Sequence, residues 1–226
     1  LASARPAAVG TRKLTIDKAS SRVELLMEAP VEKIRGKVVG ATEGELDVDL
    51  TDLTKTSGKL TVDISGIELF QRVANDKGEL GEEKKNDLQN KHARDWLEIG
   101  EDAPADKKAA NAQVAFLVSK VENVSAKDVT RLTGAERKVT MTATGEFLLH
   151  GRKSTKSAEI EAVFTFEGDK AVSVHVTTVK PFPAGLEEHD VRPRKGFGVL
   201  AEKGLEALGQ KVAKEAQVTL DFTAKL

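Results

Sequence analysis

The sequence contains no cysteine and no tyrosine, and aromatic residues make up only 4% of its 226 residues. The lack of cysteine excludes a disulfide framework, a thiolate nucleophile and a zinc site with thiolate ligands. It leaves the compartment open, because exported proteins without cysteine are common. No apolar run approaches the ~18 residues of a membrane-spanning helix, so we expect no integral membrane segment.

The chain also lacks an excess of charge of either sign. Its net charge is −1, although 31% of its residues are charged. Such a balance creates no overall field that would attract nucleic acid or an anionic membrane surface. We therefore expect no nucleic-acid partner.

Sequence motifs of catalysis and metal binding are missing as well. There is neither a Gly-x-Ser-x-Gly elbow nor a Walker loop, and one match to Gly-x-Gly-x-x-Ala, at residues 196–201, has no strand before it. The histidines lack the short spacings of zinc motifs; they are His92, His150, His175 and His189. We predict no catalytic residues, no metal site and no cofactor.

What the chain does have is alternation of apolar and polar residues. In residues 137–167 two long alternating runs flank the polar stretch His-Gly-Arg-Lys-Ser-Thr-Lys-Ser, which predicts a hairpin of two strands with one apolar face each. The number of further strands, with no helices regularly between them, predicts an all-β antiparallel barrel or sandwich. These strands are expected at 13–17, 22–28, 31–40, 45–50, 59–69, 114–118, 171–178 and 217–225.

A charged insertion at residues 71–113 interrupts this alternation. Within it, apolar residues from Leu88 to Ile99 recur at helical spacing, which predicts one short helix. Asn86 is its expected N-cap, and Gly100 follows its expected end. An insertion this long is typical of functional or mobile loops.

A second segment without alternation, residues 180–216, contains three prolines and predicts a loop followed by a helix at 200–212. Residues 1–11 predict a disordered tail, so the expected organisation is a single domain spanning 12–226. Leu1 is followed by Ala, Ser and Pro, a composition that suits either a trimmed export signal or a truncated chain.

Small residues recur at the apolar positions of the strands. An eight-stranded barrel is just wide enough to be filled by side chains or to hold one small ligand. Small inward residues favour the second arrangement, unless large residues opposite them fill the space. The small residues are Gly36, Gly40, Ala112, Ala143, Gly145, Ala162 and Ala224.

Several stretches resemble, in order, the YceI-like family of lipid-binding proteins. They are LTIDKASSRVELLME, IRGKVVGATEGELDVDL, SGKLTVDISGIEL and VTMTATGEFLLHGRKSTKSAEIEA. The most specific is the segment from Gly145 to Gly151. The other matching residues are Ile16, Asp17, Ser21, Gly36, Arg94, Asp95, Thr155 and Lys156.

The resemblance implies an extended, lipocalin-like, antiparallel eight-stranded barrel whose apolar interior holds a long isoprenoid, either a polyprenyl quinone or a polyprenyl phosphate. Family members of this kind are usually exported bacterial proteins, so the resemblance implies a periplasmic or secreted protein. Trp96 stands where the family commonly shows an aromatic pair after its Arg-Asp. The segments 71–91 and 180–216 are longer than usual for the family.

We therefore predict a non-enzymatic protein that binds, stores or transports a long-chain lipid, and we leave a homodimer open. The predicted ligand contacts are Leu25, Met27, Val38, Val62, Ile64, Trp96, Phe116, Met141, Phe147, Phe164 and Phe166. At the mouth, basic residues would meet a polar head group; these are Arg94, Lys153 and Arg194.

Two alternatives remain open at this stage. A barrel filled by its own side chains would act as a protein-interaction module through segments 71–113 and 180–216. A barrel enzyme on a small apolar substrate would need His150 or His175 within hydrogen-bond reach of a cavity, to act as a base.

Overall fold

The computed structural model describes residues 11–29, 32–192 and 213–226. All strands in these residues belong to one antiparallel sheet of 13 strands. They are β1 Thr11–Ile16, β2 Arg22–Ala29, β3 Glu32–Val39, β4 Thr42–Asp49, β5 Ser57–Asp63, β6 Glu68–Val73, β7 Lys84–Lys85, β8 Gln113–Glu122, β9 Glu136–Leu149, β10 Arg152–Glu167, β11 Lys170–Thr178, β12 Phe182–Gly185 and β13 Glu215–Lys225.

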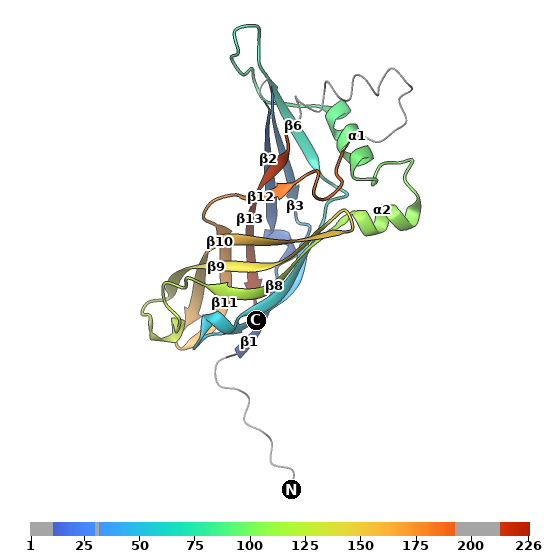
Figure 1. Ribbon diagram of the computed structural model, residues 1–226. Helices are drawn as coiled ribbons and strands as arrows, with labels where there is room; N and C mark the ends of the chain where they lie inside the picture. The colour runs from blue at the N-terminus through green and yellow to red at the C-terminus, as the bar shows by residue number, and fades with distance from the viewer. Residues whose placement is uncertain (1–10, 30–31, 193–212) are drawn as a thin grey trace.

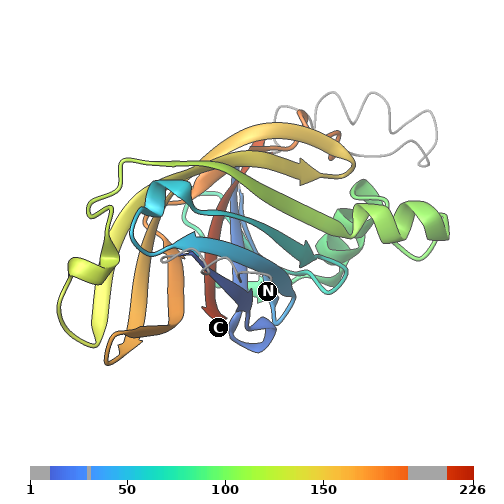
Figure 2. The same cartoon turned by 90° about the horizontal axis from the view of Figure 1, so that it is seen from below.

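Eight of these strands close into a barrel, in the order β1-β4-β5-β8-β9-β10-β11-β13 and back to β1 (Figures 1 and 2). The closing pair is short, with Ile16 opposite Ala224 and Thr15 opposite Lys225. The amide of Asp17 extends it by donating to the carbonyl oxygen of Thr223 at 2.8 Å. The predicted all-β, eight-stranded, lipocalin-like barrel is confirmed.

β13 is shared between two walls. Its C-terminal half closes the barrel, while residues 217–221 pair with β2, which continues the sheet through β3, β6 and β7. β12 pairs with residues 215–218 of the same strand. In Figure 1, β2, β3 and β6 rise beyond the barrel, so one end of the molecule has a taller wall than the other.

The opposite end of the barrel is filled. Arg137 is only 9% exposed, and its guanidinium lies 3.6 Å from the centre of the Phe166 ring. It also donates to the carbonyl oxygens of Val129 and Thr130, which belong to a short 3₁₀ helix, η3 (Val129–Arg131). The other core side chains at this end include Leu14, Ile16, Leu46, Val48, Val139, Met141, Phe164, Val174, Phe222 and Ala224.

Two α-helices lie in the described part of the chain, α1 (Asp87–Trp96) and α2 (Ala105–Asn111). α1 is the predicted helix. The left-handed residue after its end is Glu98 (φ 52°), and the amide of Gly100 donates to the carbonyl oxygen of Arg94 at 3.1 Å. α2 was not predicted. Neither described helix has the length and apolar character needed to cross a membrane.

Several sequence expectations differ from the structure. The strand expected at 59–69 is interrupted by a turn at Ile64–Ile67, which separates β5 from β6. The expected hairpin turn is only His150-Gly151; both have positive φ, as a tight two-residue turn requires, and the following polar residues begin β10. β12 lies within the loop expected at 180–216. Thr11 begins β1, although it was expected to end the N-terminal tail. The helix expected at 200–212 lies outside the described residues.

β12 was missed because Pro183 lies inside it. Proline cannot donate to a sheet ladder and is tolerated on edge strands. β12 pairs with β13 alone, so it is such an edge.

Candidate functional site

A cavity of about 560 Å³ lies at the tall end of the barrel. Its walls come from β2, β3, β5, β6, β8, β9, β12, β13 and α1, and they are almost entirely apolar. The apolar lining includes Val23, Leu25, Met27, Ile34, Leu60, Val62, Ile64, Ile67, Leu69, Trp96, Leu97, Val114, Phe116, Phe147, Leu149, Phe182, Ala184, Leu186, Val191, Val218 and Leu220.

The change from hollow to filled is visible along a single strand. On β13, the inward residues Val218 and Leu220 line the cavity and are half-buried. Two and four residues further on, Phe222 and Ala224 are 4% and 0% exposed. All four residues face the same side of the strand. The difference in their exposure therefore reflects how completely side chains from other elements fill the space opposite them.

Phe116 and Phe147 mark the boundary between the hollow and filled parts. They are direct partners across the β8–β9 pair, and both line the cavity. The Phe147 ring meets Phe182 of β12 edge to face, with 6.1 Å between ring centres. It meets His189 in the same way at 5.3 Å. Such pairs fix ring orientation and add about 0.5–1.5 kcal/mol beyond burial.

A buried histidine network joins the elements around this boundary. His189 is 0% exposed; its Nδ1 donates to the carbonyl oxygen of Gly185 at 2.7 Å, and its Nε2 lies 3.0 Å from the Ser154 hydroxyl. His150 lies 3.2 Å through Nδ1 from the carbonyl oxygen of His189 and 3.1 Å through Nε2 from a Glu98 carboxylate oxygen. Both ring nitrogens of His150 are therefore engaged, one by the His189 carbonyl and the other by the Glu98 carboxylate.

We call this network the clamp, because it joins three segments of the cavity wall. It connects the loop after α1, the β9–β10 turn and the segment after β12, each of which carries a cavity wall residue next to it: Leu97, Leu149 and Leu186. Glu98 and His150 hold left-handed backbone conformations, with φ of 52° and 50°. Such conformations cost of order 1–3 kcal/mol and persist where the surroundings determine them.

The few charged residues on the cavity wall are acidic or imidazole side chains. Among the described lining residues these are Glu32, His92 and Asp95, and none is lysine or arginine. Asp95 accepts from Lys91 at 2.9 Å on the exposed side of α1, and this hydrogen bond raises the pKa of Lys91. Glu32 accepts from Gln71 across β3 and β6.

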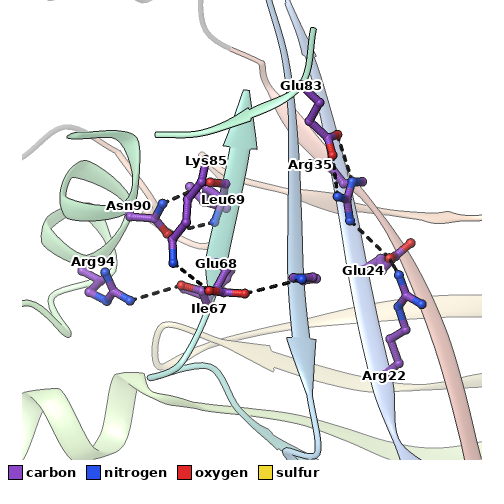
Figure 3. A network of polar contacts seen from close by, with 11 residues as sticks. Arg22, Glu24, Arg35, Ile67, Glu68, Leu69, Glu83, Lys85, Asn90 and Arg94 are labelled. Carbon is purple, nitrogen blue, oxygen red and sulfur yellow. Dashed lines mark hydrogen bonds and ion pairs between the residues drawn. The ribbon is translucent and has the colours of Figure 1, made fainter. Parts of the chain in front are cut away.

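α1 is held on β6 by one buried side chain. Asn90 is 4% exposed; its Oδ1 accepts from the amide of Leu69 at 2.8 Å, and its Nδ2 donates to the carbonyl oxygen of Leu69 at 3.1 Å (Figure 3). Arg94 donates to the carbonyl oxygen of Ile67 at 3.2 Å. The helix thereby places Trp96 and His92 on the cavity wall.

Ion pairs cover the outer face of the tall wall (Figure 3). Arg35 of β3 donates to both carboxylate oxygens of Glu83, at 3.0 and 2.6 Å, and this pairing lowers the pKa of Glu83. Lys85 donates to Glu68 at 2.8 Å. Such exposed pairs hold β7 beside β6 and keep the wall's outer face polar while its inner face is apolar.

The structure brings seven of the eleven predicted contact residues together on the cavity wall: Leu25, Met27, Val62, Ile64, Trp96, Phe116 and Phe147. The other four are buried in the core but do not line the cavity: Val38, Met141, Phe164 and Phe166. Their strand parity was read correctly. They differ from the other seven in their position along the barrel axis, about which parity carries no information.

Two of the three predicted mouth residues, Arg94 and Lys153, do not reach the cavity. Arg94 binds the Ile67 carbonyl, and Lys153 pairs with Glu146 at 2.9 Å on the exposed face of the β9–β10 hairpin. Neither lines the cavity. Arg194 lies outside the described residues.

Sequence reasoning missed one large part of the wall. Val23 shares the parity of Leu25, and Val218 and Leu220 alternate in the last strand, so extending the parity argument would have found them. Phe182 and Ala184 had no such signal, because flanking prolines indicated a loop.

Comparisons with known proteins agree with this architecture. No protein-family model and no curated protein matches the sequence. Among solved structures, a polyisoprenoid-binding domain from Saccharophagus degradans implicated in plant cell wall breakdown matches with a TM-score of 0.52. The sequence identity is 13%, over 94% of this chain and 97% of that chain. The chain has the YceI-like fold. At this identity the likeness establishes the fold alone.

Motif residues behind the YceI-like resemblance have structural roles at the barrel seam. Ser21 is 1% exposed, accepts from the amide of Thr42 at 3.1 Å and donates to the carbonyl oxygen of Lys18 at 2.7 Å. Asp17 accepts from Lys225 at 2.5 Å, which lowers the pKa of its carboxyl group. These contacts hold β1, β4 and β13 together where the YceI-like barrel closes.

Proposed function

We propose that this protein binds the hydrocarbon chain of an isoprenoid or a similar lipid inside the cavity, and stores or carries it without chemical change. The observation that supports this most directly is an apolar cavity of about 560 Å³ on whose wall several inward-facing apolar side chains remain only half-buried, among them Leu25, Val218 and Leu220. Sites for small apolar ligands commonly measure ~300–1,000 Å³. The structural neighbour is described as a polyisoprenoid-binding domain.

Burial of the hydrocarbon chain alone can supply enough free energy for binding, without polar contacts. Each buried methylene contributes ~0.8 kcal/mol, so a prenyl unit of five carbons contributes about 4 kcal/mol. Three such units approach the upper part of the ~4–15 kcal/mol lost on association. A chain of this kind therefore binds through burial, and the cavity shape decides which chains fit.

The head group expected at this cavity is uncharged. Glu32 and Asp95 would repel a phosphate, while their oxygens and His92 accept or donate hydrogen bonds. A polyprenyl quinone or polyprenol therefore suits the described wall better than a polyprenyl phosphate does.

The two histidines considered above as possible bases, His150 and His175, do not face the cavity. Both ring nitrogens of His150 are directed to Glu98 and His189, and His175 lies on the outer surface 2.8 Å from Asp221. Neither histidine lines the cavity. A base for cavity chemistry would need to reach a bound substrate.

A filled-cavity variant tests the proposal. Val218→Phe places a larger apolar side chain inside the cavity, whereas Thr219→Phe places the same group on the other face of β13. Native mass spectrometry after incubation with a polyprenyl quinone should show a bound ligand in the unmodified protein and in Thr219→Phe, and at least tenfold less in Val218→Phe. A clean ligand-free mass for the unmodified protein, with polyprenyl quinones and phosphates alike, would instead favour a protein-interaction module.

A further inference from the structure

We propose that Phe116 and Phe147 form a floor that sets the length of hydrocarbon chain the cavity accepts. This inference rests on the proposed function, because it concerns the same cavity. It goes further by naming the residues that select among prenyl chains.

The floor is defined by where each strand stops lining the cavity. On β9, Leu149 and Phe147 line it, whereas Gly145 and Ala143, at the same parity, do not. On β8, Val114 and Phe116 line it, but Val118 does not. Since Phe116 and Phe147 are register partners on the neighbouring strands β8 and β9, their rings lie side by side at one level along the barrel axis.

The Phe147 ring is supported from the side. Phe182 and His189 meet it edge to face, with interplanar angles of 83° and 88°. His189 is held by Gly185 and Ser154 through its two ring nitrogens. A ligand chain therefore cannot push the ring aside without breaking a buried hydrogen-bonded cluster.

Beneath the floor, β9 presents its smallest side chains. Gly145 and Ala143 follow Phe147 on the inward face, and Met141 comes next. Shortening either phenylalanine would therefore extend the cavity toward positions that carry little side-chain bulk. The filled core resumes at Met141 and Phe164.

The cavity volume sets the scale of the selection. At ~30 Å³ for each water-sized group in a liquid, the 560 Å³ cavity has room for on the order of 20 carbon-sized groups. This corresponds to about four prenyl units. Longer chains would leave their additional units outside the described wall, where they gain little from burial.

The experiment is a competition among prenyl alcohols of two to nine units, with bound fractions read by native mass spectrometry. For the unmodified protein we expect affinity to rise with length up to about four units and then to change less than threefold per unit. In Phe147→Leu and in Phe116→Leu, the affinity for the alcohol one prenyl unit longer than this limit should rise about tenfold, equivalent to ~1.4 kcal/mol.

Two further variants separate the floor from general loosening. Phe164→Leu makes the same chemical change in the filled core, at a side chain 2% exposed, and should leave the length profile unchanged. Leu220→Phe adds bulk to the cavity wall and should shift the profile to shorter alcohols, which keeps the test decisive if the phenylalanine variants unfold.

The outcomes are distinguishable. Two results would contradict the proposal that Phe116 and Phe147 limit chain length. One is an affinity that keeps rising up to nine units in the unmodified protein. The other is the same length profile in the two floor variants, in Leu220→Phe and in Phe164→Leu. Absence of binding by every alcohol to the unmodified protein would overturn the proposed function itself.

Discussion

Single residues decide how closely the strands at the floor approach one another. At Gly145, a Cβ atom would lie 2.1 Å from the carbonyl oxygen of Leu117 on the neighbouring strand β8. The β8–β9 register shifts just beyond this point, between Val118 and Lys120. Glycine is therefore required here by the close backbone approach, and this is also the most specific part of the family motif.

We expect Gly145→Ala to destabilise the protein by about 1–3 kcal/mol, because a rigid carbonyl cannot move aside as a side-chain end would. Urea unfolding measures this change. Gly66→Ala is the matched control, since a Cβ there meets nothing within 4 Å. Equal stabilities of the two variants would contradict the close approach.

Asp128 shows how one carboxylate organises a turn. Its Oδ1 accepts from the amide of Thr130 at 3.0 Å and from the Thr130 hydroxyl, and these bonds lower its pKa. Asp49 and Asp52 bind the threonine two residues on in the same way.

Because the folded-state pKa of Asp128 lies below its unfolded value of ~3.9, its contribution to stability is complete above that value. The contribution is lost as pH falls through the folded pKa. We expect Asp128→Ala to be less stable than the unmodified protein at pH 7, with the difference shrinking as the pH falls below about 4. Denaturant unfolding at both pH values tests this, and a difference that grows in acid would contradict it.

At the scale of elements, α1 is a wall of the cavity that depends on few buried contacts. Asn90 supplies two buried hydrogen bonds to Leu69, whereas the hydrogen bond from Arg94 to the Ile67 carbonyl is only partly buried. An element anchored in this way opens more readily than the strands of the barrel.

Asn90→Ala would leave the buried amide of Leu69 without its partner, and the carbonyl of Leu69 with only the longer hydrogen bond from the Asn86 amide, at 3.4 Å. Loss of such partners costs about 1–3 kcal/mol. We expect faster amide hydrogen exchange in α1 and β6, and little change in β9–β11. Leu88→Ala, at a side chain 61% exposed on the same helix, is the control. Uniform exchange changes throughout the barrel would contradict a local role.

At the scale of the whole molecule, one sheet builds both a filled core and a hollow end. β13 joins them, because it closes the barrel through β1 and carries the tall wall through β2. The filled end supplies stability, and the hollow end leaves apolar surface unburied.

A ligand should therefore protect the two ends unequally. With geranylgeraniol at about 100 times its dissociation constant, the free energy of unfolding should rise by about 2.7 kcal/mol. Amide exchange should slow most in α1, β2, β3 and β6, which surround the cavity, and least in β10 and β11. Equal slowing of exchange in all strands would contradict binding in the cavity. It would indicate that the alcohol binds elsewhere, or that it slows only exchange that requires unfolding of the whole protein.

Much of the fold could be predicted because its signals are local. Alternation located most strands and the inward face of each, and helical spacing located α1. α2 and β12 were missed because their sequences are short or contain proline, and their form depends on partners such as β13. The clamp of His150, Glu98 and His189 joins residues far apart in sequence, and nothing in their spacing predicted it.

The sequence by itself determined an all-β barrel, the inward parity of its strands and the apolar nature of its interior. The tertiary structure alone decided where that interior is empty. Leu25 and Phe147 face the cavity, whereas Met141 and Phe164, with the same inward parity, lie in a filled core. Parity is a property of one strand, whereas filling depends on which distant strands and helices lie opposite.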